Sequence, residues 1–235
     1  MVGEGPRRGI EILRRDTRLV EDPDAIRSVH AAYFEAGADV AISASYQATF
    51  EGLAGRGIDR NQAAALMRRS VELAREAAGS GRVVAASVGP YGAMLGNGAE
   101  YTGDYDKDED QLVEFHVPRI EALAEAEPDV LAVETIPSFV EARALVRALE
   151  KVPEIPAWVS FSCRDGRHIC DGTPIGSAVE VVASAPGVVA VGVNCTSPLF
   201  VERLVETISD TTGKHIVCYP NRGPFWDAMR KTWTD

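Results

Sequence analysis

The residues whose side chains could most clearly take part in a reaction are an asparagine and a cysteine at the end of an apolar run. Asn194 and Cys195 close the segment 188–195, whose small and β-branched residues are typical of a strand buried on both faces. Ser197 and Pro198 then open a helical pattern, with proline at a favoured first-turn position. In α/β proteins the active-site residues typically lie at the carboxyl ends of parallel strands. A buried structural cysteine is the alternative interpretation.

Polar side chains follow the other apolar runs in the same way. Glu134 comes directly after Val130–Val133, where a carboxylate must either find a partner, such as Arg164, or face a cleft. His168 lies in a loop and either touches a substrate or makes a local hydrogen bond. Because parallel strands end on one rim, we expect Glu134 and Cys195 to lie there together. The residues that follow the apolar runs do not suggest a hydrolase triad, because they include Glu, Asn, Cys, Ser and Tyr but no histidine base.

Alternating strands and helices must position these residues. Six runs rich in Val, Ile and Ala read as strands: Asp39–Tyr46, Val83–Gly89, Val130–Ile136, Ala157–Cys163, Val188–Cys195 and His215–Tyr219. Helical patterns lie between or beside them: Asp24–Ala36, Arg60–Ala78, Glu109–Ala126, Phe139–Glu150, Ile175–Ala185 and Leu199–Ser209. Repeated βα units predict one domain with a parallel sheet covered by helices. An open doubly wound sheet and a closed (β/α)8 barrel both fit this pattern.

A long glycine-rich stretch, Gly89–Tyr105, follows the second predicted strand. Its spacing matches neither the dinucleotide fingerprint nor the Walker phosphate loop. Long loops inside compact domains are usually functional, and Tyr91, Tyr101 and Tyr105 suit a lid over an organic or cationic group. A merely flexible surface loop is the alternative.

Composition narrows the class of protein. The 235 residues carry a net charge of −11, which argues against nucleic acid or an anionic membrane surface as a partner. No apolar run approaches the roughly 18–20 residues that a membrane span requires. Four cysteines in a chain of this length do not form a disulfide framework, so we expect a cytoplasmic protein.

Several motifs in one order resemble the homocysteine S-methyltransferase family. They are Ser45-Tyr-Gln-Ala-Thr49, Ser87-Val-Gly-Pro-Tyr-Gly-Ala93, Glu100-Tyr-Thr-Gly-Asp-Tyr105, Glu134-Thr-Ile-Pro137, Ser160-Phe161, Gly192-Val-Asn-Cys195 and Tyr219-Pro-Asn221. The resemblance covers about Val20 to Trp233 and implies a (β/α)8 barrel with catalytic Zn²⁺. In such an enzyme zinc binds homocysteine as its thiolate, and methyl transfer gives methionine. The loop Gly89–Tyr105 resembles the branch that uses S-methylmethionine or S-adenosylmethionine as the donor.

The resemblance also implies roles for single residues. Cys195 would be one of three zinc-binding cysteines, and Glu134 would hold the amino group of the substrate. Asn194 would sit beside Glu134 in the same pocket. A thiol attacks a sulfonium methyl only as thiolate, a state that zinc enforces on a coordinated thiol. The faces of Tyr91, Tyr101 and Tyr105 would suit the positive charge of the sulfonium donor.

Two departures from the family pattern lie at the ends of the chain. No adjacent cysteine pair is present, although the family's other two zinc ligands form one, and Met1–Arg18 lacks the family's first strand and Asp-Gly-Gly loop. We therefore expect residues 1–235 to form one homocysteine-binding domain truncated at both ends, with six of eight barrel strands and weak zinc binding. Cys163 and Cys218, on strands flanking that of Cys195, are possible substitute ligands.

Two other functions remain open at this point. One is a non-catalytic homologue that binds an amino acid or a partner chain without metal. The other is a metal-free lyase in which Glu134 acts as the base.

Overall fold

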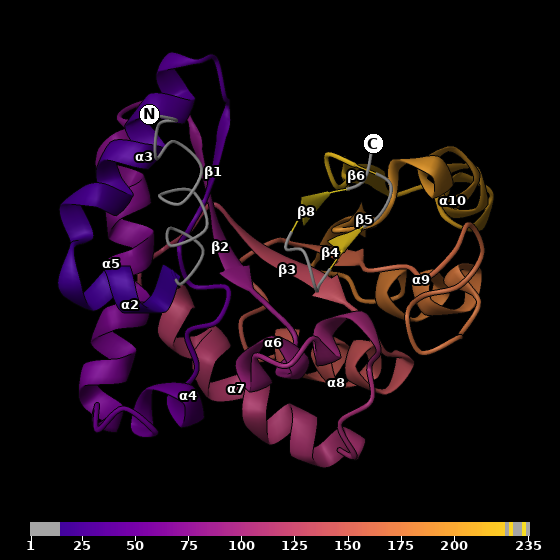
Figure 1. Ribbon diagram of the computed structural model, residues 1–235, viewed down its shortest axis with the longest axis horizontal. Coiled ribbons are helices and arrows are strands. Elements are labelled where there is room, and N and C mark those ends of the chain that lie inside the picture. Colours follow the sequence, from indigo (N-terminus) through magenta and orange to yellow (C-terminus); the bar gives the residue numbers. More distant parts are fainter. Residues whose placement is uncertain (1–14, 224–225, 228–231, 234–235) are drawn as a thin grey trace, which may run out of the picture.

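Strands and helices alternate along the chain in the computed structural model, which describes residues 15–223, 226–227 and 232–233 (Figure 1). The strands are β1 (Val40–Ile42), β2 (Val83–Val88), β3 (Val130–Ile136), β4 (Ala157–Phe161), β5 (Val188–Asn194), β6 (His215–Tyr219), β7 (Trp226–Asp227) and β8 (Thr232–Trp233). The helices are α2 (Arg15–Glu21), α3 (Pro23–Glu35), α4 (Phe50–Ala54), α5 (Arg60–Ala78), α6 (Tyr91–Leu95), α7 (Glu109–Ala124), α8 (Phe139–Leu149), α9 (Ile175–Ala183) and α10 (Pro198–Thr211), with the 3₁₀ turn η1 (Ala99–Tyr101).

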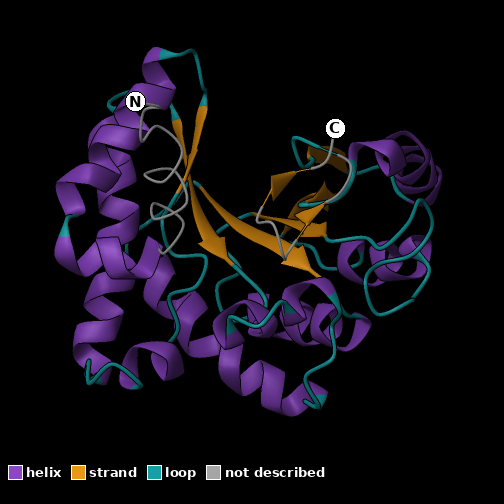
Figure 2. Cartoon of the chain, in the orientation of Figure 1, coloured by secondary structure: helices purple, strands orange, loops and turns teal. Residues whose placement is uncertain are grey.

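The order of the strands decides the type of α/β fold. Strands β1 to β6 form one parallel sheet in which each strand pairs with the next along the sequence. A doubly wound sheet instead reverses its order at a switch point. The sheet curls, and the helices lie along its outer side (Figures 1 and 2). This arrangement is part of a (β/α)8 barrel, which confirms the expected fold class and excludes the doubly wound alternative.

The two faces of the sheet have different environments. Leu131 and Val133 of β3 are fully buried in the large apolar core that the sheet forms with the outer helices. Ala132 belongs instead to a small inner cluster with Ala85 of β2. Because side chains alternate along a strand, Glu134 projects on the same inner side as Ala132. The barrel interior therefore begins with apolar residues and becomes polar toward the carboxyl ends of the strands.

Capping residues fix where the helices around the sheet begin. Asp59 and Asp108 each form a reciprocal capping box with a glutamine three residues later, at the starts of α5 and α7. Ser138 caps α8, and its hydroxyl accepts a hydrogen bond from the backbone N–H of Glu141. The cap places Glu141 in the first turn of α8, just after the carboxyl end of β3.

The structure corrects the predicted element boundaries mainly near the carboxyl ends of the strands. The predicted strand Asp39–Tyr46 is shorter, and β1 covers only Val40–Ile42. The stretch Gly89–Tyr105 was expected to be irregular, but it contains α6 and η1. Residues 1–14 lie outside the described part of the chain, so the expected absence of a first strand there stays a prediction.

None of the helices in the described part of the chain is long and apolar enough to cross a membrane.

Candidate active site

A buried carboxylate lies at the centre of the polar groups near the strand ends. Glu134 of β3 is 6% exposed, and the hydroxyl of Ser87 on β2 donates to its Oε1 at 2.5 Å. The hydroxyl of Tyr219, at the end of β6, donates to its Oε2 at 2.9 Å. Hydroxyl groups from β2 and β6, which lie on opposite sides of β3 in the strand order, thus hold the carboxylate of Glu134.

Tyr219 connects this carboxylate to the inner face of β4. Its hydroxyl accepts a hydrogen bond from Nε1 of Trp158 at 3.1 Å and lies 3.0 Å from the hydroxyl of Ser160. Burial, followed by the negative charge of Glu134, raises the pKa of Tyr219 well above its ordinary value. The phenol therefore stays protonated at neutral pH and remains a hydrogen-bond donor to Glu134.

Asn194 makes four hydrogen bonds inside the protein, which hold the site together. Its Oδ1 accepts from the backbone N–H of Thr135 at 2.7 Å and from the hydroxyl of Ser160 at 2.8 Å. Its Nδ2 donates to Oγ1 of Thr135 at 2.7 Å and to Sγ of Cys195 at 3.4 Å. These bonds use both lone pairs and both N–H groups of the amide. In this arrangement Asn194 positions its neighbours.

Two residues of the site have a left-handed backbone. Thr135 has φ of 65° and Cys195 has φ of 48°, values that are uncommon for residues with a side chain and costly for a β-branched one. At the same place the pairing register between β3 and β4 shifts between Val133 and Ile136. Bulges and strained residues of this kind concentrate at functional sites because the surrounding contacts hold them in place.

The thiol of Cys195 lies on the same rim as Glu134, as the parallel strands predicted. Its Sγ is 3.8 Å from Oγ1 of Thr135, and Tyr101 makes a further hydrogen-bonding contact with it. Burial raises the pKa of this thiol, and the charge of Glu134 acts in the same direction, whereas the hydrogen bonds oppose the shift. Without a bound cation the thiol is therefore protonated at neutral pH.

The three loop tyrosines occupy different places. Tyr101 is 50% exposed and lies next to Cys195. Tyr91 and Tyr105 lie together, with ring centroids 5.4 Å apart, and Tyr91 packs edge-on against Phe115 of α7 at 4.9 Å. The hydroxyl of Tyr105 donates to the carboxylate of the buried Glu141. Of the three tyrosines, Tyr101 is the one that the structure brings to Cys195.

The other cysteines do not gather around Cys195. Cys163 is buried after β4, and its hydrogen bond with Thr196 opposes the pKa increase that burial causes. Cys218 is exposed and lies next to Tyr219 on β6, so alternation directs it away from the inner face. Within the described residues no group of three His, Cys, Asp or Glu side chains could hold a metal ion. The suggestion that Cys163 and Cys218 replace the missing ligands is therefore wrong.

Two further candidates form local contacts in the loop after β4. Nδ1 of His168 lies 3.0 Å from both carboxylate oxygens of Asp165. Arg164, considered as a partner for Glu134, lies 3.7 Å from the same carboxylate. The local hydrogen bond considered for His168 is thus present.

Sequence reasoning missed a set of buried ionisable residues near these loops. Glu141, His116 and Arg119 are each 0% exposed. A charged residue at a core-facing position of a helix is a sequence signal for such a cluster, because an unpaired buried charge is unfavourable. His116 and Arg119 lie three residues apart on one face of α7, and apolar Phe115 and Ile120 flank them in the sequence.

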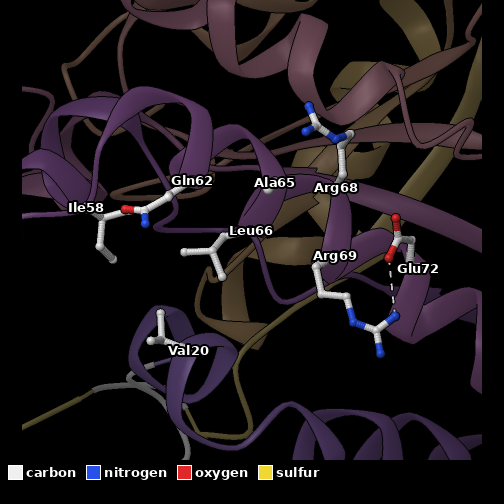
Figure 3. A pocket seen from close by; sticks show the side chains of 8 residues that line it. All are labelled: Val20, Ile58, Gln62, Ala65, Leu66, Arg68, Arg69 and Glu72. Atoms are coloured by element: carbon white, nitrogen blue, oxygen red, sulfur yellow. Dashed lines mark hydrogen bonds and ion pairs between the residues drawn. The ribbon is translucent and has the colours of Figure 1, made fainter.

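A groove of about 720 Å³ is lined by residues of α2 and α5 and by Ile58, which precedes α5, and by none of the strand-end residues (Figure 3). Val20 of α2, Ile58 and Leu66 form its apolar part, and Arg69 and Glu72 pair across one end. Its remaining lining residues are Gln62, Ala65 and Arg68. The groove has none of the strand-end groups described above and is not the candidate active site.

Comparisons with known proteins identify the family. The family model described as homocysteine S-methyltransferase matches residues 7–235. Homocysteine S-methyltransferase YbgG of Bacillus subtilis is 46% identical in an alignment of length 227 that covers 92% of this chain and 72% of that protein. The metallated form of homocysteine methyltransferase MmuM from Escherichia coli matches with a TM-score of 0.85 and 44% identity, over 92% of this chain and 78% of that one. Its oxidized form gives the same TM-score at 45% identity, over 89% and 75%. The chain belongs to the homocysteine S-methyltransferase family.

Proposed function

We propose that the strand-end cluster binds homocysteine and that the chain transfers a methyl group to its sulfur, giving methionine. The observation that carries this proposal is the link between Glu134 and Cys195. The two residues lie on one rim, and a chain of polar contacts through Tyr219, Ser160 and Asn194 connects them. A carboxylate and a thiol held together in this way fit the two ends of a small amino acid that carries an ammonium group and a sulfur.

Each residue has a distinct role in the proposal. Glu134 holds the ammonium group of homocysteine through charge-assisted hydrogen bonds, which are stronger than neutral ones. Cys195 lies where the sulfur of homocysteine would bind, and Asn194 orients the thiol of Cys195. The donor is S-methylmethionine or S-adenosylmethionine, and the ring of Tyr101 faces its sulfonium charge. Tyr91 and Tyr105 do not contact the donor in this proposal but support the conformation of the loop 89–105.

Zn²⁺ bound through Cys195 is part of the proposal, and the metallated form of the similar MmuM supports it. A zinc ion would supply the thiolate state that the sulfur of homocysteine needs in order to attack a methyl group. The described residues offer Cys195 but no complete group of three ligands, so they do not fit a zinc ion by themselves. No step of the reaction is therefore assigned to the metal.

The proposal extends to the whole chain. Residues 1–235 are proposed to form a single homocysteine-binding domain that acts on small molecules in the cytoplasm. Nucleic acids and membranes are not proposed as partners, because a net charge of −11 repels polyanionic surfaces.

The test is an assay of methionine formation by the purified 235-residue chain. Homocysteine is supplied with S-methylmethionine or with S-adenosylmethionine, with and without added Zn²⁺. We expect methionine from at least one donor, dependence on zinc, loss of activity in Cys195→Ser and retention of activity in the control Cys218→Ser, which removes an exposed thiol.

Two outcomes would contradict the proposal in different ways. Binding of homocysteine without methionine formation would identify a non-catalytic homologue. Equal activity in Cys195→Ser and in the unmodified chain would show that Cys195 has no part in the reaction.

A further inference from the structure

Three ionisable side chains are buried together where helices α7 and α8 meet the strand-end loops. Glu141 of α8 and His116 and Arg119 of α7 form this buried ionisable cluster, and each is 0% exposed. Burial lowers the pKa of His116, so its imidazole is the neutral member. Burying charged groups is costly unless each is paired and hydrogen bonded. Many of their hydrogen-bond partners here belong to the loops around the candidate active site. The cluster therefore connects the helix layer to those loops.

Glu141 contacts the loop 89–105 at both ends. Its Oε1 accepts a hydrogen bond from the backbone N–H of Tyr91 at 2.6 Å and lies 2.8 Å from Nε2 of His116. Its Oε2 accepts a hydrogen bond from the hydroxyl of Tyr105. One carboxylate thus ties the first helical residue of the loop to its last tyrosine, with η1 and Tyr101 between them.

Arg119 makes a similar connection between the loops that follow β1 and β2. Its Nη1 donates to the carbonyl of Gly89 at 2.8 Å, and its Nη2 donates to the carbonyls of Ser45 and Tyr46 at 3.2 and 3.1 Å. Burial lowers the pKa of Arg119 to about 10, and the charge of Glu141 opposes that shift. The guanidinium therefore remains charged at neutral pH, and three backbone carbonyls receive its hydrogen bonds.

The loop also has contacts at its centre. The hydroxyl of Ser162 donates to the backbone carbonyl of Glu100 at 3.0 Å, next to Tyr101. A Cβ on Gly92 would lie 2.6 Å from the backbone of Ala99 and Glu100, so α6 and η1 pack with no space to spare. The loop that carries Tyr101 is thus held by Glu141 at both ends and packed in its middle.

We propose that Glu141 is a positioning residue for the methyl donor. By holding the amide of Tyr91 and the hydroxyl of Tyr105, it keeps the loop 89–105 in the conformation that places Tyr101 beside Cys195. Glu141 does not touch either substrate and acts through the loop. This inference rests on the proposed function, in which the sulfonium donor lies against Tyr101.

The test compares two glutamate substitutions in the full chain. Glu141→Gln keeps the shape of the side chain and removes its charge, whereas the control Glu109→Gln removes the surface ion pairs of α7 with Arg143 and Arg147 of α8. Both substitutions affect contacts between the same two helices, but only the first touches the loop. A third variant, Tyr105→Phe, removes one hydroxyl and keeps the ring, so it remains informative if Glu141→Gln fails to fold.

Two quantities are measured for each variant. The first is the affinity for S-methylmethionine and, separately, for homocysteine, by titration calorimetry. The second is the rate of hydrogen–deuterium exchange of the amides in residues 90–101. In Glu141→Gln we expect about tenfold weaker donor binding and about tenfold faster exchange, as for the loss of one charge-assisted hydrogen bond. Homocysteine affinity should stay within about twofold, and Tyr105→Phe should show a smaller change in the same direction.

The opposite results would overturn the inference. Unchanged donor affinity despite faster exchange would show that the conformation of the loop does not determine donor binding. Equal losses for donor and homocysteine, or the same losses in Glu109→Gln, would indicate a purely structural role. If the unmodified chain binds neither compound, the proposed function and the donor role of Glu141 both fail, while the exchange rates still decide whether Glu141 holds the loop.

Discussion

Glu134 and Asn194 are both buried at the strand ends, but they use their hydrogen-bonding capacity differently. The amide of Asn194 accepts two and donates two hydrogen bonds, all with neighbouring protein groups. The carboxylate of Glu134 accepts from the hydroxyls of Ser87 and Tyr219. The side chain of Asn194 is neutral, whereas the carboxylate of Glu134 can attract an ammonium group through charge-assisted hydrogen bonds. The two residues should therefore respond differently to substitution.

Glu134→Gln should weaken homocysteine binding by roughly ten- to hundredfold. The substitution keeps the size of the side chain but removes the negative charge that attracts the ammonium group. Calorimetry with homocysteine measures the effect, and the exposed Glu202→Gln on α10 serves as the control. Zinc content should not change, because Glu134 is not assigned as a metal ligand. Loss of zinc with unchanged homocysteine affinity would reverse that assignment.

Asn194→Ala should lower the free energy of unfolding by about 2–3 kcal/mol. The substitution leaves the backbone N–H of Thr135 and the hydroxyl of Ser160 without their buried partner, and it removes two contacts that support a left-handed backbone. Denaturant unfolding measures the change. Asn61→Ala, at an exposed position of α5, should alter stability by no more than about 0.5 kcal/mol. Equal effects of the two substitutions would show that the network around Asn194 contributes little.

At the scale of elements, the sequence predicts the βα repeat well because each strand and helix has its own local pattern. Strands β3 and β6 match their predicted bounds, as does α5, which has a capping aspartate. The first strand is shorter than predicted because the chain turns after Ile42 and places Ser45 beside the end of β2, where the hydroxyl of Ser45 donates to the carbonyl of Ser87. That contact joins residues 42 positions apart, and no local pattern records it.

The loop 89–105 contains two short elements that the sequence did not predict. Helix α6 has five residues and η1 has three, lengths at which helices depend on tertiary packing more than on intrinsic preference. Gly92 allows the two elements to pack directly against each other. The fold of the loop is therefore decided by contacts with itself and with α7 and α8.

Gly92→Ala should destabilise the protein by about 1–3 kcal/mol and weaken donor binding, since the added Cβ overlaps with the backbone of residues 99 and 100. A matched control is Gly213→Ala, where a Cβ meets nothing within 4 Å. Thermal unfolding reports stability, and calorimetry with S-methylmethionine reports the donor site. If Gly92→Ala behaves like the control, the close packing of α6 on η1 is not needed.

At the scale of the whole molecule, parallel strand order explains what the sequence could predict of the site. All strand carboxyl ends meet on one rim, so Glu134, Asn194 and Cys195 were expected together and lie together. The positions of Tyr91 and Tyr105 depend on Glu141 and Phe115, which lie on other helices. A motif in one segment does not reveal such partners. For this reason the positions of the loop tyrosines were less predictable than those of the strand-end residues.

Zinc binding is a property of the whole chain, because it depends on how many deprotonated ligands reach one point. The four cysteines include no adjacent pair, and the described residues bring no group of three ligands together. We therefore expect the purified chain to retain well under one zinc per protein after dialysis, and to form methionine slowly unless Zn²⁺ is added. Without zinc, the sulfur of homocysteine stays largely protonated at neutral pH, given an ordinary thiol pKa near 8.5.

Elemental analysis of dialysed protein measures the zinc content per chain. The methionine assay at increasing Zn²⁺ measures how the rate depends on the metal. Cys195→Ser should reduce the remaining zinc affinity further, because it removes the one ligand assigned to the site. The control Cys218→Ser should not, because that thiol is exposed on β6. One tightly bound zinc per chain with rapid turnover would contradict this account. It would mean that a complete ligand set forms from residues other than those assigned to it.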